Sequence, residues 1–287
     1  MSYAGNLEER ITSALDTLSP MHKRMARFIL DNRYFASFAP ASQVGEKNAT
    51  SAATVVRFAQ ALGYEGYPEL QDALRAELPS YMTAANRMQA RIRSAKPPAS
   101  TPQQVFYTDI HNIERTAGNL SDDNLDHALQ MILKARRIHV IGAGLSSAAS
   151  LYLAHSLKVM GFDARAVEGE GLQAAIELSR LQPEDLLIAI DLWRYVRMTV
   201  NAVEMARERS IQTIAITDSI VSPLAQMADC AFEIATEGVA HSLSVTALMS
   251  LLNVFVAMLA DRVPQQVVES LRRVDEAYRA NDLLIMK

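Results

Sequence analysis

The chain has 287 residues, 49% of them apolar, which is enough for two domains with sizeable cores, since a domain holds roughly 150 residues. Its net charge is −4, and residues 1–80 carry eight basic against nine acidic residues, which argues against a broad, strongly basic surface for nucleic acid. The single cysteine, Cys230, excludes an internal disulfide framework and a cysteine-rich zinc site. The first residues lack the basic start and apolar run of a secretory signal, so we expect a cytoplasmic protein.

The first predicted elements are helices. Apolar residues recur at helical spacing over residues 1–18, and two shorter helices are predicted over 40–46 and 51–62, with Gly63 ending the second. A tight turn around residues 47–49 joins them. Such a pair is typical of a helix-turn-helix, whose second helix enters the major groove of DNA.

The second helix of this pair is predicted to be amphipathic. A hydroxyl at its start, from Thr50 or Ser51, can accept a bond from a backbone N–H of the first turn. Its apolar face is formed by four residues at helical spacing, namely Val55, Phe58, Ala59 and Leu62. These four side chains are therefore expected in the core of the helical domain.

The same stretch carries a family resemblance. The string SAATVVRF at residues 51–58, followed by LGYEGY at 62–67, resembles the pattern S-x-A-T-V-V-R-F…L-G-Y-x-G-F of the RpiR family of bacterial transcription regulators, with Tyr67 in place of phenylalanine. Residues 18–29 are similar to the opening segment of that family. The resemblance implies a DNA-binding domain over residues 1–79.

The residues that this resemblance presents to DNA lie at the start of the second helix. We expect Ser51, Ala52, Thr54 and Arg57 to be presented to DNA near this recognition helix, and Lys47 or Arg87 to contact phosphates. For Arg57 an ion pair inside the domain is an equally open interpretation.

A linker is predicted over residues 80–104, because residues 96–102 hold three prolines in seven positions. The remaining residues, 105–287, form the second predicted domain. Two helices come first, over about 103–118 and 122–135.

From residue 137 the pattern changes to short apolar runs that alternate with amphipathic helices. Strands are predicted over five segments, namely 137–142, 163–167, 185–190, 212–217 and 230–235. This alternation indicates a parallel sheet covered by helices on both faces. The predicted fold is thus an all-α helix-turn-helix domain followed by an α/β domain with a doubly wound, five-stranded parallel sheet.

Two closing helices are predicted over 241–262 and 264–280. Residues 238–260 contain no charged side chain, yet they include several polar residues and lack flanking aromatic anchors. A buried or interface helix is therefore favoured over a membrane span, and no membrane partner is expected.

A glycine loop follows the first strand. Gly142 and Gly144 let the backbone approach a ligand, and the next helix, which begins at Ser146 and Ser147, offers free N–H groups to an anion. A tight turn alone would also require glycine. In its context, with the strings IGAGLS, LKVMG, DLLIAI and AITDS, the loop resembles the SIS fold, the sugar-isomerase domain that usually follows the RpiR-type helix-turn-helix.

After the third strand the sequence departs from that resemblance. The family usually has S-x-S-G-x-T there, whose hydroxyls and backbone hold a sugar phosphate, whereas this chain has DLWRYV at residues 191–196. Three interpretations are open. Arg194 and Arg197 clamp a carboxylate or phosphate; Asp191 and Trp193 receive a cationic or flat ligand; or Asp191 and Arg194 form a structural ion pair in a pocket without ligand.

Two further candidates are weaker. Glu168 follows the second strand and could act as an acid or base near a sugar, although capping the next helix is the simpler role. His241 precedes the long apolar helix and could touch a ligand or begin that helix. No residue spacing indicates a metal site or nucleophilic catalysis, so no metal, cofactor or catalytic residue is predicted.

These patterns lead to a hypothesis of a DNA-binding regulator, not an enzyme. Its partners would be a double-stranded operator, a small-molecule effector and a second copy, as a homodimer or homotetramer. The resemblance implies a phosphosugar effector, whereas the altered loop favours a carboxylate or heterocyclic ligand. The alternatives are a sugar-phosphate isomerase with an accessory helical domain, and a metabolite-binding module whose helical domain contacts protein.

Overall fold

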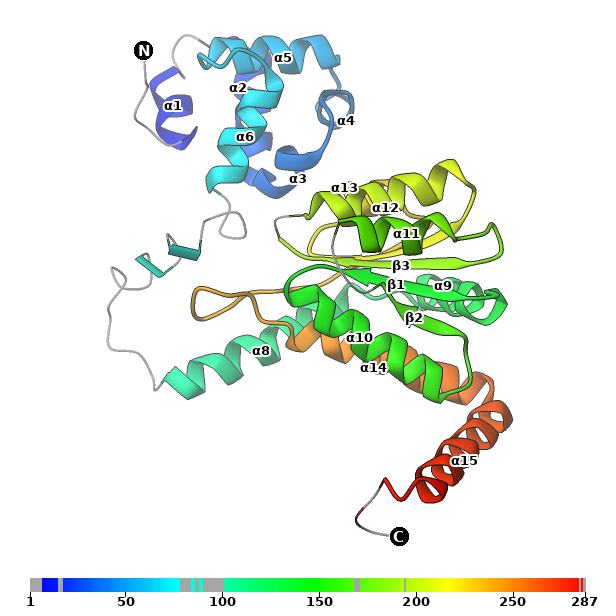
Figure 1. Cartoon of the computed structure of the whole chain (residues 1–287). Coiled ribbons are helices and arrows are strands. Elements are labelled where there is room, and N and C mark those ends of the chain that lie inside the picture. The colour runs from blue at the N-terminus through cyan, green and yellow to red at the C-terminus, as the bar shows by residue number, and fades with distance from the viewer. Residues whose placement is uncertain are drawn as a thin grey trace. The chain divides into compact units, whose positions relative to one another are not determined.

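The structure is a computed structural model of the chain (Figure 1). It describes residues 7–14, 18–77, 84–85, 88–89, 101–167, 171–193, 195–283 and 285. The chain divides into two compact units, Met1–Ala95 and Lys96–Lys287. The predicted boundaries at residues 79 and 104 stay a prediction.

The first unit is helical throughout its described residues. Its helices are α1 (Leu7–Ala14), α2 (Pro20–Asp31), α3 (Arg33–Phe38), α4 (Ala41–Lys47), α5 (Ala52–Ala61) and α6 (Tyr67–Glu77). The four predicted core residues of α5 are buried, and Gly63 follows the helix with φ +86°. The Ser51 hydroxyl accepts from the backbone N–H of Thr54 at 3.3 Å, so Ser51 is the residue that caps α5.

The turn between α4 and α5 depends on close backbone approach. The Thr50 N–H donates to the carbonyl of Gly45 at 2.8 Å, and a Cβ on Gly45 would lie 2.8 Å from the Thr50 oxygen. Buried Asn48 donates its side-chain amide to the carbonyl of Val44 at 2.9 Å, and Ala49 takes φ +51°. Local hydrogen bonds and one glycine therefore fix the angle between the two helices.

Tyr67, which departs from the family's phenylalanine, uses its extra oxygen inside the core. Its ring is buried, and its hydroxyl donates to the carbonyl of Ala36 at 2.7 Å and lies 3.2 Å from that of Ala39. Both carbonyls lie at the C-terminal end of the short helix α3. Burial raises the pKa of the Tyr67 hydroxyl. The substitution therefore ties α6 to the end of α3.

The second unit contains a single parallel sheet in its described residues. Its strands are β1 (Ile138–Gly142), β2 (Ala164–Ala166), β3 (Leu186–Asp191), β4 (Gln212–Thr217) and β5 (Cys230–Glu233). They lie in the order β2-β1-β3-β4-β5, with every neighbouring pair parallel. The order reverses at β1 and β3, so the loops after these two strands flank the switch point where such sheets bind ligands.

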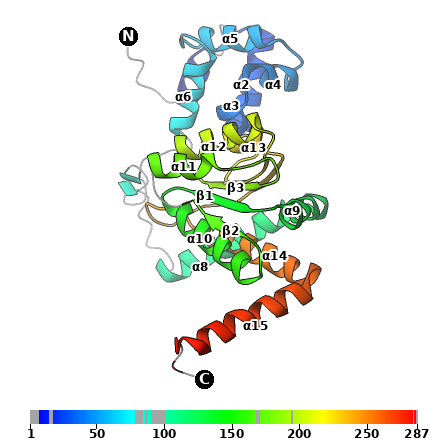
Figure 2. The same ribbon diagram turned by 45° about the vertical axis from the view of Figure 1, so that its right-hand side comes forward.

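Helices cover both faces of this sheet. The helices of the second unit are α8 (Thr101–Gly118), α9 (Asp122–Lys134), α10 (Leu145–Val159), α11 (Leu172–Ser179), α12 (Arg197–Glu208), α13 (Pro223–Met227), α14 (Thr246–Arg262) and α15 (Pro264–Ala280). Figure 2 shows α11, α12 and α13 on one face, and α8, α10 and α14 on the other. The predicted doubly wound sheet is confirmed.

The two faces differ in the size of their core residues. The core on the α10 and α14 side is rich in leucine, isoleucine and phenylalanine, with Phe232 packed edge-on against Phe255 at 5.2 Å between centroids. The core on the α11 and α12 side is smaller, and it combines isoleucine, leucine and valine with five alanines, which are Ala174, Ala189, Ala202, Ala206 and Ala215. Helices α11 and α12 are therefore held by less apolar area.

The first closing helix begins later than predicted. Helix α14 starts at Thr246, and residues 234–245 before it are irregular. Asn112 of α8 holds this segment, donating to the carbonyl of Glu237 at 2.8 Å and accepting from its N–H at 3.2 Å. Gly238 packs against the Ser242 carbonyl where a Cβ would lie only 2.0 Å away, a loop geometry that helical spacing cannot reveal.

The long apolar helix α14 faces the domain core with Leu248, Leu252 and Phe255. Among the described helices, none alone has the length and apolar character to cross a bilayer; α14 and α15 satisfy that test only when joined across a bend of 106°.

Candidate DNA and effector sites

The start of α5 presents a chain of linked polar side chains. Ser51 and Arg57 are exposed, and Thr54 lies between them. The Ser51 and Thr54 hydroxyls are 3.1 Å apart, and the Arg57 guanidinium donates to the Thr54 hydroxyl at 3.2 Å. The described partner of Arg57 is thus a hydroxyl rather than a carboxylate, which leaves its charge available on the surface.

The other predicted DNA residues surround this chain. Lys47 is exposed at the end of α4 with its Nζ 5.0 Å from the ring centroid of Phe35, and Ala52 is half-buried in the first turn of α5. Arg87 lies outside the described residues. Sequence reasoning missed Ala53 and Gln60, which are exposed and share the face of Arg57 at helical spacing.

The glycine loop after β1 lies beside the end of β3, because Gly142 pairs with Ile190 in the sheet register. A Cβ on Gly142 would lie 2.5 Å from the Ser150 hydroxyl and 2.7 Å from the Ser146 carbonyl, so glycine lets α10 pack onto the strand. Gly144 takes φ +57° and ψ −124°, a conformation that favours glycine. Both glycines are therefore needed by the backbone itself.

The two serines of this loop differ. Ser146 is buried, whereas Ser147 is exposed and its hydroxyl donates to the carbonyl of Gly144 at 2.7 Å. Ser147 is thus open to solvent at the start of α10, and Ser146 belongs to the packing of that helix.

Asp191 ends β3 and is 2% exposed. Its carboxylate accepts the backbone N–H of Val196 at 2.6 Å, the residue before the first turn of α12. Burial raises the pKa of Asp191 from 3.8 to about 6; the N–H of Val196 and the hydroxyl of Thr199 lower this pKa, and the charge of Asp218 raises it. This carboxylate is therefore directed at the protein backbone, and its charge is costly near neutral pH.

The loop that follows Asp191, between β3 and α12, turns sharply. Trp193 takes φ +72° and is half-buried, and the Tyr195 N–H donates to its carbonyl at 2.9 Å. The Tyr195 hydroxyl donates to Asp218, after β4, at 2.8 Å. Arg197 is exposed as the first residue of α12. The loop between β3 and α12 is thus tied to the next strand and presents Arg197 outward.

Of the three remaining predicted ligand residues, the structure describes His241 alone. Glu168 and Arg194 lie outside the described residues. His241 is exposed in the irregular segment before α14, and no described contact joins it to the glycine loop or to Asp191. The described residues contain no cluster of histidine, cysteine and carboxylates that could hold a metal ion.

Comparison with known proteins matches both units. Residues 5–80 match the family described as helix-turn-helix domain, rpiR family, and residues 131–258 match the SIS domain. The regulator HexR of Pseudomonas aeruginosa is 30% identical over 80% of this chain and 79% of its own length. The chain belongs to the RpiR family of transcriptional regulators. The regulator YfhH of Escherichia coli is also 30% identical, over 83% of this chain and 85% of its own length.

Solved structures agree with this RpiR-family assignment. The sugar isomerase domain of an RpiR transcription factor from Sphaerobacter thermophilus is 38% identical, with a TM-score of 0.61 over 62% of this chain and 99% of that one. The Vibrio vulnificus NanR protein, complexed with ManNAc-6P, is 25% identical, with a TM-score of 0.66 over 95% of this chain and 98% of that one. This RpiR-family chain is thus a transcriptional regulator with a helix-turn-helix and a SIS domain.

Proposed function

We propose that this regulator recognises its operator through the exposed face of α5 and senses a small metabolite at the loops after β1 and β3. The DNA part of this proposal rests on Ser51, Thr54 and Arg57, whose side chains are linked by hydrogen bonds at the exposed, capped start of α5. Hydroxyls and a guanidinium at this position are suited to hydrogen bonds with base edges. Lys47 supplies a positive charge for a phosphate.

The DNA proposal is tested with Arg57→Ala and DNA from upstream of the protein's own gene. Removing a guanidinium that contacts a base should cost about 1–3 kcal/mol, hence roughly 5- to 150-fold in affinity, and should relax sequence preference. Fluorescence anisotropy with this DNA and with an unrelated sequence, at one salt concentration, measures both effects. Arg207→Ala, at an exposed arginine of α12, is the matched control and should leave affinity unchanged. Equal loss in both variants would reject α5 as the reading helix.

The effector proposal rests on the switch point between β1 and β3. Gly144, exposed Ser147 and the N-terminus of α10 suit an anionic group, and Arg197 adds a positive charge from the neighbouring loop. Asp191 directs its carboxylate to the backbone of α12, which favours Arg197 over Asp191 as the direct ligand contact. We propose an effector with a carboxylate or phosphate; the NanR complex with ManNAc-6P supports a phosphosugar, and the altered loop supports another acid or a heterocycle.

A thermal-shift screen of phosphosugars, organic acids, amino acids and nucleobases tests the effector proposal. A ligand that binds only the folded chain should stabilise it by about 2.7 kcal/mol at a concentration one hundred times its dissociation constant. Trp193, the only tryptophan, reports binding near the loop through its fluorescence. Stabilisation that persists unchanged in Arg197→Gln would remove that residue from the site.

The regulator is proposed to act as a homodimer or homotetramer in the cytoplasm, with effector binding changing the spacing of two DNA-binding units. Isomerase activity is the second candidate, because the SIS fold is shared with proteins named as sugar-phosphate isomerases, among them one from Listeria monocytogenes at 21% identity, a TM-score of 0.50 and coverage of 58% of this chain and 92% of that one. Turnover of sugar phosphates by the purified chain would favour it over a purely sensory domain.

A further inference from the structure

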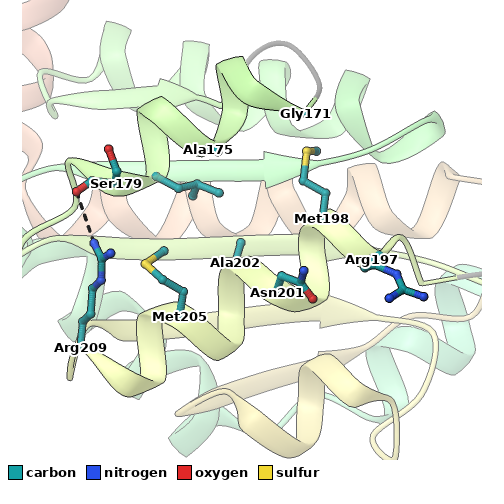
Figure 3. Close-up of a pocket in the computed structure, with 10 residues that line it drawn as sticks. Gly171, Ala175, Ser179, Arg197, Met198, Asn201, Ala202, Met205 and Arg209 are labelled. Carbon is teal, nitrogen blue, oxygen red and sulfur yellow. Dashed lines mark hydrogen bonds between the residues drawn. The ribbon is translucent and has the colours of Figure 1, made fainter.

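A groove of about 440 Å³ lies between α11 and α12 on the alanine-rich side of the sheet (Figure 3). Its floor and walls are apolar, with Leu178 and Ala202 buried and Met198 and Met205 partly buried. This volume is in the range of small-molecule sites, which are mostly apolar with a few placed polar groups. Arg197, which follows the loop after β3, lies in the lining of the groove, and the groove was not predicted from the sequence.

Small side chains on both helices create the space. Ala175 of α11 is exposed at the wall of the groove, and Ala202 of α12 lies in its lining. A larger residue at either position would occupy the cavity, since its two walls are adjacent helices. The two methionines in the lining are flexible and adapt to apolar ligands of varied shape.

The charges at the groove have one sign. Among the described residues that line it, the charged ones are Arg197 at one end of α12 and Arg209 just past the other end (Figure 3). The Arg209 guanidinium donates to the carbonyl of Ser179 at 3.3 Å, which holds this side chain at its end of the groove. Arg197 is exposed at the other end. The chain as a whole carries a net charge of −4, so this local positive charge is selective for an anion.

We infer that this groove binds a small amphipathic anion, with an apolar body between α11 and α12 and a carboxylate or phosphate held by Arg197. The site goes beyond the proposed effector site, with which it shares Arg197 alone. An occupant would therefore alter the charge that the neighbouring loop presents to the effector.

The alternative occupant is a second copy of the chain. Leu172 and Ile176 are 85% and 57% exposed on α11 and do not line the groove. Apolar side chains of this kind also suit contact between copies, which buries them without any anion. The two occupants differ in their dependence on ligand charge and on protein concentration.

The test uses the full chain and three ten-carbon probes below their micelle concentrations: decanoate, decan-1-ol and decylammonium. Isothermal titration calorimetry and Trp193 fluorescence are recorded together. Decanoate should bind saturably at one site per chain, and decylammonium about fivefold more weakly, since an exposed charge contact contributes up to about 1 kcal/mol. Equal affinity of the acid and the amine overturns the proposal.

Two pairs of variants localise the site. Ala175→Leu places a larger side chain in the groove at an exposed helical position and should abolish decanoate binding, whereas Gln173→Leu adds the same apolar group on α11 outside the lining. Arg197→Gln should weaken decanoate binding about three- to fivefold, and Arg207→Gln should not. Circular dichroism establishes that each variant is folded.

The outcome of these titrations does not depend on DNA binding, so it is separate from a failure of the proposed function. Unchanged decanoate binding in Ala175→Leu overturns the inference. An absence of decanoate binding also overturns it. In that case, a sedimentation coefficient that falls in Ala175→Leu but not in Gln173→Leu would assign the groove to a second copy of the chain.

Discussion

Asp191→Asn is expected to stabilise the second unit by up to about 3 kcal/mol at pH 7.5. The pKa of this carboxyl rises from 3.8 to about 6 on folding, and a shift of one unit corresponds to 1.36 kcal/mol. Because the folded state holds the proton more tightly, stability is fully present below about pH 4 and is lost as the pH rises through 6. The carboxamide oxygen of asparagine can still accept the Val196 N–H and carries no charge.

Chemical denaturation at several pH values measures this effect. The free energy of unfolding of Asp191→Asn should equal that of the unsubstituted chain near pH 4 and exceed it increasingly up to pH 7.5. Asp163→Asn is the control of opposite sign, because a hydrogen bond from Arg137 at 2.8 Å lowers the pKa of Asp163. That carboxylate stabilises above its ordinary pKa, so its loss should destabilise at neutral pH. A pH-independent difference for Asp191→Asn would contradict the assignment.

Gly45→Ala is expected to cost about 1–3 kcal/mol and to abolish operator binding. The new methyl group would lie 2.8 Å from the Thr50 oxygen and 3.0 Å from the Ser51 carbonyl carbon, both of them backbone atoms that cannot rotate away. The turn must then open, which displaces the start of α5 and with it Ser51 and Arg57. The cost in DNA affinity should therefore exceed the loss caused by Arg57→Ala alone.

Gly66→Ala is the matched control in the same unit, since its Cβ would meet Pro68 Cδ at an ordinary 3.6 Å. Thermal unfolding followed by circular dichroism, together with anisotropy on operator DNA, separates the two effects. If Gly45→Ala binds DNA with unchanged affinity, the helix-turn-helix angle does not control recognition.

The helix-turn-helix and the sheet could be predicted because their signals are local. Val55, Phe58 and Ala59 repeat at helical spacing and are fully buried, and the apolar run at 186–190 is buried along its whole length. Gly63 marks the end of its helix through its positive φ. Each of these signals comes from residues that are close together in the sequence, so the pattern of residues alone was enough to predict them.

The candidate sites were less predictable because they depend on where side chains point and on how helices pack in the folded chain. For Asp191 the sequence left both a ligand contact and a structural ion pair open, and it did not reveal that the carboxylate accepts the backbone N–H of Val196, five residues later. His241 was expected either to touch a ligand or to begin a helix; that helix begins later, at Thr246, and His241 lies in an irregular segment that Asn112 holds from α8. The groove depends on how α11 and α12 are placed side by side, with Ala175 and Ala202 in its lining, which no spacing within either helix reveals.

The unequal cores on the two faces of the sheet have a consequence for amide hydrogen exchange. Helices α10 and α14 share the larger core, so their amides should exchange only through opening of the whole second unit. Helices α11 and α12 rest on a smaller core and border a groove, so their amides should exchange through smaller openings that leave the sheet intact. Ligand-dependent protection would then concentrate in one layer, and the slow-exchanging layer would serve as the fixed frame against which the regulator senses its ligand.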